Sequence, residues 1–213
     1  MSTASPTPVL RLDKMRWVVH GRRHRLEPEP LTLSPGQTAL VSAGAAAEAF
    51  TDVLLGLARL ESGAIRMAGQ DISAVAPDER AIGLIPAGGG LLPNRKVDRN
   101  IALAAQSRPV REFVPGNVRF AAERTRVDAF LKRYPHELAP DDRARVALAR
   151  ALMRQRLPRV LLVEDRTGHA PCHPVVSAAR DTDAELAILV ITDDRSRVPT
   201  LCPPSLTWET THA

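Results

Sequence analysis

Hydrophobic residues alternate with polar ones in some stretches of the chain and form continuous runs in others. Residues 9–19 alternate as a half-buried strand does, and a turn follows at 21–23. Shorter apolar runs, typical of buried strands, are found at 38–41, 80–86, 159–165 and 185–192. Residues 206–209 read as a last edge strand. The pattern predicts a sheet that combines half-buried and fully buried strands.

Helical periodicity is found between these strands. The alanine-rich run at 43–49 is typical of a helix start, and residues 106–133 are helical in pattern, with a proline-marked break at 109–115. From residue 141 to 152 one helix side carries Val146, Leu148 and Leu152, while arginines occupy the rest. Strands alternating with helices predict an α/β protein.

Composition narrows the class of protein. A length of 213 residues fits one domain, and no run approaches the ~18 apolar residues of a membrane span. The N-terminal residues lack a basic region followed by an apolar stretch, so no secretory signal is expected. The net charge is +5, but the arginines are scattered among acidic residues, so we expect no nucleic-acid partner.

One stretch resembles a known family closely. Residues 133–152, RYPHELAPDDRARVALARAL, are similar to the signature region of ATP-binding-cassette (ABC) ATPases. The stretches at 61–72, 80–86, 91–103 and 159–165 are similar to other parts of that family, in the same order. The resemblance implies a P-loop NTPase-like ABC ATPase fold with a mixed core sheet, an antiparallel β subdomain and a small helical subdomain. It implies a single domain over 1–213, with core sheet and β subdomain at about 1–87 and 157–213 and a helical subdomain at about 88–156.

The family's phosphate-loop residues are replaced in this chain. The positions that match the loop are Ser42, Gly44, Ala45, Ala47, Glu48 and Ala49. Glu48 stands at the position of the phosphate-binding lysine, and Ala49 at that of the hydroxyl that holds Mg²⁺. One charge pair at ~4 Å is worth about 4 kcal/mol at an effective dielectric near 20, so this exchange turns an attraction into a repulsion.

The other nucleotide motifs depart from the family as well. The signature centre reads Ala139, Pro140, Asp141 and Asp142, where the family has Ser-Gly-Gly-Gln. Ala87 takes the glutamine-loop position, Glu164 and Asp165 reverse the usual acidic pair, and Asp193 takes the place of the switch histidine. If the family fold holds, the acids Glu48, Glu164, Asp165, Asp193 and Asp194 converge on one anionic pocket. Trp17 or His20 falls near the family's adenine-stacking position, and either is equally compatible with packing.

Two further groups of residues have open interpretations. Leu91, Leu92, Pro93 and Asn94 lie in a stretch that resembles the family's permease-docking groove, although it is also compatible with a role in folding alone. His169, Cys172 and His173 raise the question of zinc, with Cys202 as a fourth ligand. Their spacing is not that of a standard zinc site, so we interpret them as a loop and a helix start without a metal.

Together these substitutions predict an ABC-type pseudo-ATPase that is not an enzyme and holds no cofactor. It would act as a structural or regulatory partner of a membrane permease, a catalytically intact ABC ATPase, or both, at the cytoplasmic face of the membrane. One alternative is an ABC ATP-binding protein in an asymmetric heterodimer, with weak residual binding of ATP and Mg²⁺. Another is a soluble interaction module that binds an anionic polymer through its arginines.

Overall fold

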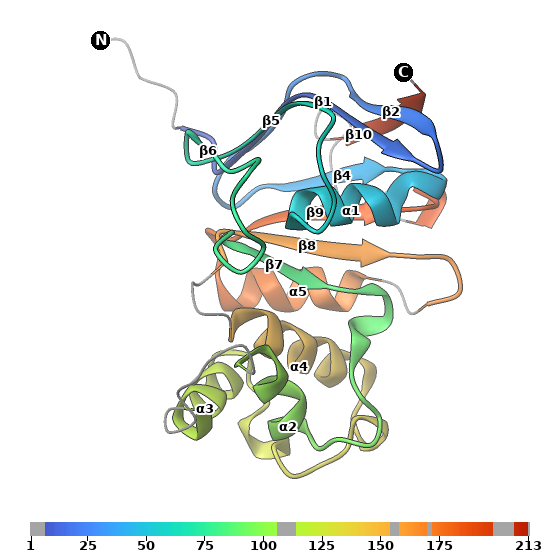
Figure 1. The fold of residues 1–213 in the computed structure, drawn as a ribbon. Coiled ribbons are helices and arrows are strands. Elements are labelled where there is room, and N and C mark those ends of the chain that lie inside the picture. The colour runs from blue at the N-terminus through green and yellow to red at the C-terminus, as the bar shows by residue number, and fades with distance from the viewer. Residues whose placement is uncertain (1–6, 106–113, 154–157, 170–171, 198–206, 213) are drawn as a thin grey trace.

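The computed structural model describes residues 7–105, 114–153, 158–169, 172–197 and 207–212. In these residues ten strands form one sheet, and five α-helices accompany it (Figure 1). The strands are β1 (Leu10–Val19), β2 (Arg22–Glu27), β3 (Leu31–Leu33), β4 (Thr38–Ser42), β5 (Ser62–Met67), β6 (Gln70–Asp71), β7 (Ile82–Ile85), β8 (Val160–Asp165), β9 (Ala187–Thr192) and β10 (Thr207–His212). The helices are α1 (Ala47–Leu55), α2 (Val97–Ala102), α3 (Val114–Arg124), α4 (Pro140–Leu152) and α5 (His173–Thr182).

The sheet is mixed, with an antiparallel part and a parallel part. Its order is β6-β5-β1-β2-β10-β4-β9-β8-β7, and β3 pairs with β1. Strands β10, β4, β9, β8 and β7 run parallel to their neighbours in that series, whereas β1, β2, β3, β5 and β6 pair antiparallel. The α/β class with a mixed sheet is therefore confirmed.

The prediction of an edge strand at 206–209 is wrong. Strand β10 lies inside the sheet, where it pairs antiparallel with β2 and parallel with β4. It joins the two parts of the sheet, and its Trp208 is buried. The segment alternates polar and apolar residues as an edge strand does. Its partner residues in β2 and β4 lie more than 160 residues earlier in the sequence. The local pattern therefore did not reveal its place in the sheet.

Two hydrophobic layers cover the parallel strands. Helix α1 packs on one face, where Phe50 and Leu54 join Val41 and Leu162 in the core. Helices α4 and α5 pack on the other face against Leu161 and Val163. Because side chains alternate along a strand, β8 contributes to both layers. Figure 1 shows α1 and α5 on opposite sides of β8.

A third hydrophobic cluster holds the helical part of the chain together. Residues of α2, α3 and α4 meet there, among them Val97, Ile101, Val118 and Val146. Helix α4 thus packs on the sheet layer with one side and on α2 and α3 with another. The domain boundaries near residues 87 and 157 stay a prediction. In the described part of the chain, no helix has both the length and the apolar character needed to cross a bilayer.

Candidate functional site

The candidate site lies at the C-terminal ends of the parallel strands, next to the start of α1. Strands β4, β8 and β9 end side by side there, with Ser42 paired to Thr192 and Asp165 also paired to Thr192. Ligands of open α/β sheets bind at this edge, where loops and helix starts leave a crevice. The predicted phosphate-loop residues and the acidic pair are brought to this one edge.

The loop after β4 folds into a single 3₁₀ turn at Gly44–Ala46 that leads directly into α1. Some of the backbone amides in and around this turn bond within the protein. Ala43 N–H donates to the carbonyl of Thr192 at 2.9 Å, Ala46 N–H donates to the carbonyl of Ala43 at 2.9 Å, and Ala47 N–H donates to that of Gly44. Gly44 has φ of +49°, which a side chain would strain. Three backbone N–H groups of residues 43–47 are therefore already bonded within the protein.

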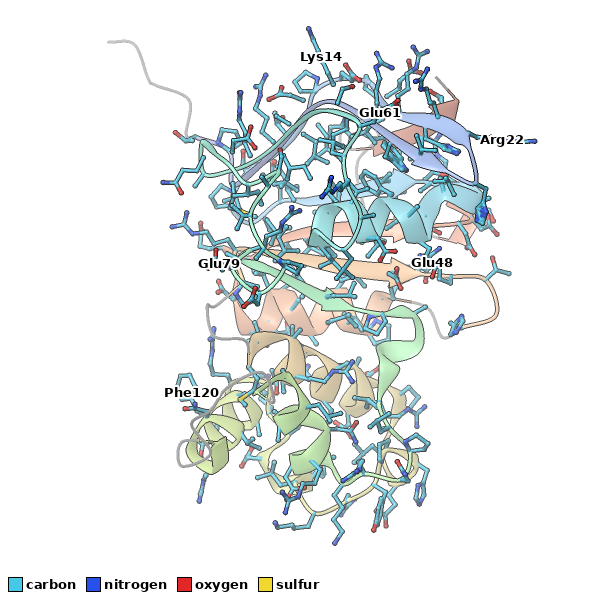
Figure 2. All side chains as sticks on the ribbon, viewed as in Figure 1. Lys14, Arg22, Glu48, Glu61, Glu79 and Phe120 are labelled. Atoms are coloured by element: carbon cyan, nitrogen blue, oxygen red, sulfur yellow. The ribbon has the colours of Figure 1, made fainter. Side chains whose placement is uncertain are left out.

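Acidic side chains occupy the first two turns of α1. Glu48 is exposed in the first turn, where the helix dipole favours a negative charge (Figure 2). Asp52 lies one turn further along. Burial raises the pKa of Asp52, and the charges of Glu48 and Glu164 raise it further, while Arg166 lowers it. These four groups therefore share one electrostatic environment.

Glu164 is held in place by three neighbours from three different segments. Its Oε1 accepts hydrogen bonds from the Thr51 hydroxyl of α1 at 3.1 Å and from the Arg166 guanidinium at 2.8 Å. Its Oε2 accepts from the backbone N–H of Ala87 at 3.4 Å. Ala87, at the glutamine-loop position, thus contacts the acidic pair through its backbone.

The five predicted acids do not all meet in one pocket. Glu164 faces α1, but Asp165 faces the other layer, where its Oδ1 accepts the backbone N–H of Cys172 at 3.1 Å. Asp193 accepts from the backbone N–H of Thr167 at 2.9 Å and from its hydroxyl at 3.1 Å. Asp194 accepts from the hydroxyl of Ser196 at 2.7 Å. Adjacent residues of a strand point to opposite faces, which separates Glu164 from Asp165.

Helix α4 and a glycine-rich turn face each other beside Glu164. Arg150 of α4 donates to the carbonyls of Gly90 at 2.6 Å and Gly89 at 2.7 Å, and burial lowers the pKa of its guanidinium. The predicted signature residues Ala139, Pro140, Asp141 and Asp142 form the start of α4, with Pro140 as the first helical residue. A cavity of about 390 Å³ lies between this helix start, residues 85–89 and the start of α5.

The segment that resembles a docking groove is exposed and has a fixed shape. Leu92 is 40% exposed, and Pro93 and Asn94 are exposed beside it, while Leu91 is partly buried against the core. The amide of Asn100, a fully buried residue, makes two hydrogen bonds to Leu92 of this segment and two to the adjoining Arg95 and Lys96. It accepts from Leu92 N–H at 2.7 Å and donates to the carbonyls of Leu92, Arg95 and Lys96.

The remaining candidates lie elsewhere. Trp17 is fully buried between His24 and Phe50, so it presents no face to a ligand, whereas His20 is exposed at the turn after β1. Cys172 is buried at the start of α5, while His169 and His173 are exposed. Cys202, the fourth zinc ligand considered, lies outside the described residues.

Sequence reasoning missed Thr51, Asp52, Arg166, Asn100 and Arg150. The sequence contained a signal for Thr51, Asp52 and Arg166. Thr51 and Asp52 follow Glu48 by one helical turn, and Arg166 directly follows two carboxylates at a strand end. Asn100 and Arg150 bond to backbone carbonyls of other segments, which the sequence does not mark.

Comparisons with known proteins identify relatives of this chain. The chain is 30% identical over 202 residues to the putative 2-aminoethylphosphonate import ATP-binding protein PhnT of Salmonella typhimurium, a match over 89% of this chain and 53% of the relative. It is 36% identical over 122 residues to the molybdate/tungstate import ATP-binding protein WtpC of Archaeoglobus fulgidus, a match over 57% of this chain and 50% of the relative. The chain spans about half the length of these curated relatives. No protein-family model matches the chain.

Solved structures share the fold. The structure of cbiO1 from Clostridium perfringens, part of the ABC transporter complex cbiONQ, superimposes with a TM-score of 0.69 at 18% identity. That match covers 92% of this chain and 82% of the other. The resemblance inferred from the signature region is thereby confirmed.

The prediction that the chain is not an enzyme is contradicted by these relatives, which are named ATP-binding proteins of importers, a class that is typically enzymatic. That prediction counted altered side chains motif by motif. It did not weigh the similarity to these relatives, which extends over 202 residues in the case of PhnT. The chain is a homologue of the ABC transporter ATP-binding proteins and has the fold of their ATPase domains.

Proposed function

We propose that this chain is the ATP-binding subunit of an ABC importer and works in an asymmetric pair with a second ATP-binding subunit. The subunit docks under a membrane permease at the cytoplasmic face. Its own nucleotide site is altered, so its partner's site carries the larger share of hydrolysis.

The observation that supports this proposal most is the contrast between two regions of the same fold. The exposed segment Leu92–Asn94 is held by the buried Asn100, which makes two hydrogen bonds to Leu92 and two to the adjoining Arg95 and Lys96; this is the organisation of a surface kept in one shape for a partner. The stretch after β4, in contrast, bonds the amides of Ala43, Ala46 and Ala47 internally and precedes an exposed Glu48. We infer that docking is preserved while phosphate binding is changed.

A protein-bound magnesium ion does not fit the described side chains of this site. Ala49 has no hydroxyl, both oxygens of Glu164 accept hydrogen bonds from neighbours, and Asp165 faces the opposite layer. Mg²⁺ requires oxygen ligands in near-octahedral arrangement at about 2.0–2.1 Å. We therefore assign no step of this subunit's function to a metal held by these side chains.

Purification from detergent-solubilised membranes of the native host tests the docking proposal. Tagged wild-type chain should co-purify with a multi-span permease and a second ATP-binding protein. Leu92→Asp should lose the permease, because it puts a charge in the centre of the exposed apolar segment. Arg22→Asp is the matched control, since Arg22 is exposed at the start of β2 in the antiparallel part of the sheet (Figure 2) and should leave the complex intact. Equal recovery of the permease by wild type and Leu92→Asp would contradict the proposal.

A further inference from the structure

Arg166 places a positive charge in the candidate site. It directly follows the acidic pair of β8, and its Nη2 lies 2.8 Å from Glu164 Oε1. The same oxygen accepts the hydroxyl of Thr51 from the second turn of α1. Arg166 and Glu164 have side chains 18% and 14% exposed. The guanidinium therefore lies against α1 at the edge where the parallel strands end, largely withdrawn from solvent.

The phosphate-loop segment of this chain supplies no positive charge of its own. Residues 34–58, which include β4, the 3₁₀ turn and α1, contain no Lys, Arg or His. They contribute Glu48 and Asp52 instead. Among the described groups that bond to Glu164, Arg166 is the one that carries a positive charge. Burial and the charges of Glu48 and Glu164 raise the pKa of Asp52 on α1, whereas Arg166 lowers it.

A polyphosphate at this edge requires a cation from some source. The loop provides no lysine, and the described side chains do not suit a magnesium ion. A guanidinium is a strong alternative, because its planar fork donates two parallel hydrogen bonds to phosphate oxygens and stays charged. We propose that Arg166 is the phosphate-facing cation of this subunit, in place of both a loop lysine and a bound metal ion. This inference rests on the proposed function as a nucleotide-binding subunit.

Calorimetric titration of the full chain with ATP, AMP and adenosine, in magnesium and in EDTA, tests the inference. Wild type should bind ATP more tightly than adenosine, with little change when EDTA replaces magnesium. Arg166→Met should weaken ATP binding by about tenfold or more, the usual size of a lost charged hydrogen bond, and leave adenosine binding unchanged. Arg166→Lys should fall between the two. Arg59→Met, at an exposed arginine beyond the end of α1, is the control and should match wild type.

A second pair of variants separates phosphate contact from simple neutralisation of Glu164. Glu164→Gln should tighten ATP binding, because it removes an acid that competes for the guanidinium. The double variant Glu164→Gln with Arg166→Met should bind ATP as weakly as Arg166→Met alone. If the double variant regains wild-type affinity, Arg166 only neutralises Glu164 and the inference is overturned.

Three other results would also overturn it. These are unchanged ATP affinity in Arg166→Met, ATP binding that disappears in EDTA, and no ATP binding by wild type at all. Circular dichroism of each variant shows whether its fold is kept. The docking part of the proposed function is tested separately by Leu92→Asp, so failure here leaves that part standing.

Discussion

Replacing Asn100 with alanine should loosen the exposed segment Leu92–Asn94 and destabilise the protein. The substitution removes four hydrogen bonds, at 2.7, 2.8, 3.1 and 3.3 Å, from a side chain with no solvent exposure. A neutral hydrogen bond is worth about 1 kcal/mol net, and the freed backbone groups of an exposed segment regain part of their hydration. The expected loss is therefore about 2–3 kcal/mol in the free energy of unfolding.

Urea unfolding followed by circular dichroism measures this loss, and thermal unfolding should show a Tm lower by roughly 5–10 °C for a chain of this length. Asn100→Asp should be worse than alanine, since it keeps the acceptor for Leu92 N–H but turns a carboxylate toward three carbonyls. Asn94→Ala is the control, because Asn94 is exposed in the same segment and should change stability by less than about 0.5 kcal/mol. If Asn100→Ala is as stable as that control, the amide does not hold the segment.

Three more predictions concern α1 and the charges around it. Arg80 is 4% exposed and donates to the carbonyls of Val53, Leu54, Ser73 and Val75. Changing Arg80 to Met should therefore lower the free energy of unfolding by about 2–4 kcal/mol. A change near zero in urea unfolding would refute this structural role. Gly56 ends α1 with φ of +82°, and a Cβ there would lie 2.7 Å from the Arg80 guanidinium carbon. Gly56→Ala should therefore lower the free energy of unfolding by at least about 1 kcal/mol. A stabilised variant would show that the turn is unstrained. Because the pKa of Asp52 is raised above its usual 3.8, the folded state holds that proton more tightly than the unfolded state, and ionisation of Asp52 costs stability as pH rises through the folded pKa. Asp52→Asn should therefore stabilise the protein at pH 7, and the gain in unfolding free energy should shrink as pH falls toward 3.8. Urea unfolding across that pH range measures this gain. A gain that grew in acid would contradict the prediction.

Much of the fold could be predicted from local patterns. The apolar runs at 38–41, 80–86, 159–165 and 185–192 became β4, β7, β8 and β9, because buried parallel strands need continuous apolar sequence. Helix α4 begins at Pro140 and ends at Leu152, where the amphipathic pattern and the proline place it. The position of β10 inside the sheet could not be predicted, since its pairing depends on strands distant in sequence.

The site was predicted in part, and the errors in that prediction have physical reasons. The sequence located the phosphate-loop residues at the strand ends, but it did not show that the amides of Ala43, Ala46 and Ala47 bond within the protein. The expected convergence of Glu164 and Asp165 overlooked strand alternation, which places neighbours on opposite faces. The prediction of a protein that is not an enzyme was wrong, because it rested on side-chain identity at single motifs, whereas the relatives are named ATP-binding proteins of importers.

Site-directed cross-linking in the assembled complex tests the central claim most directly. A cysteine at position 92 in membranes of the native host, followed by a thiol-reactive cross-linker and mass spectrometry, reports what touches the exposed segment. The account predicts a cross-link to a cytoplasmic segment of a permease, and none from a cysteine at position 22, which lies at the other end of the molecule. Cross-links to a permease from position 22 but not from position 92 would contradict the assignment of this chain as a docked importer subunit.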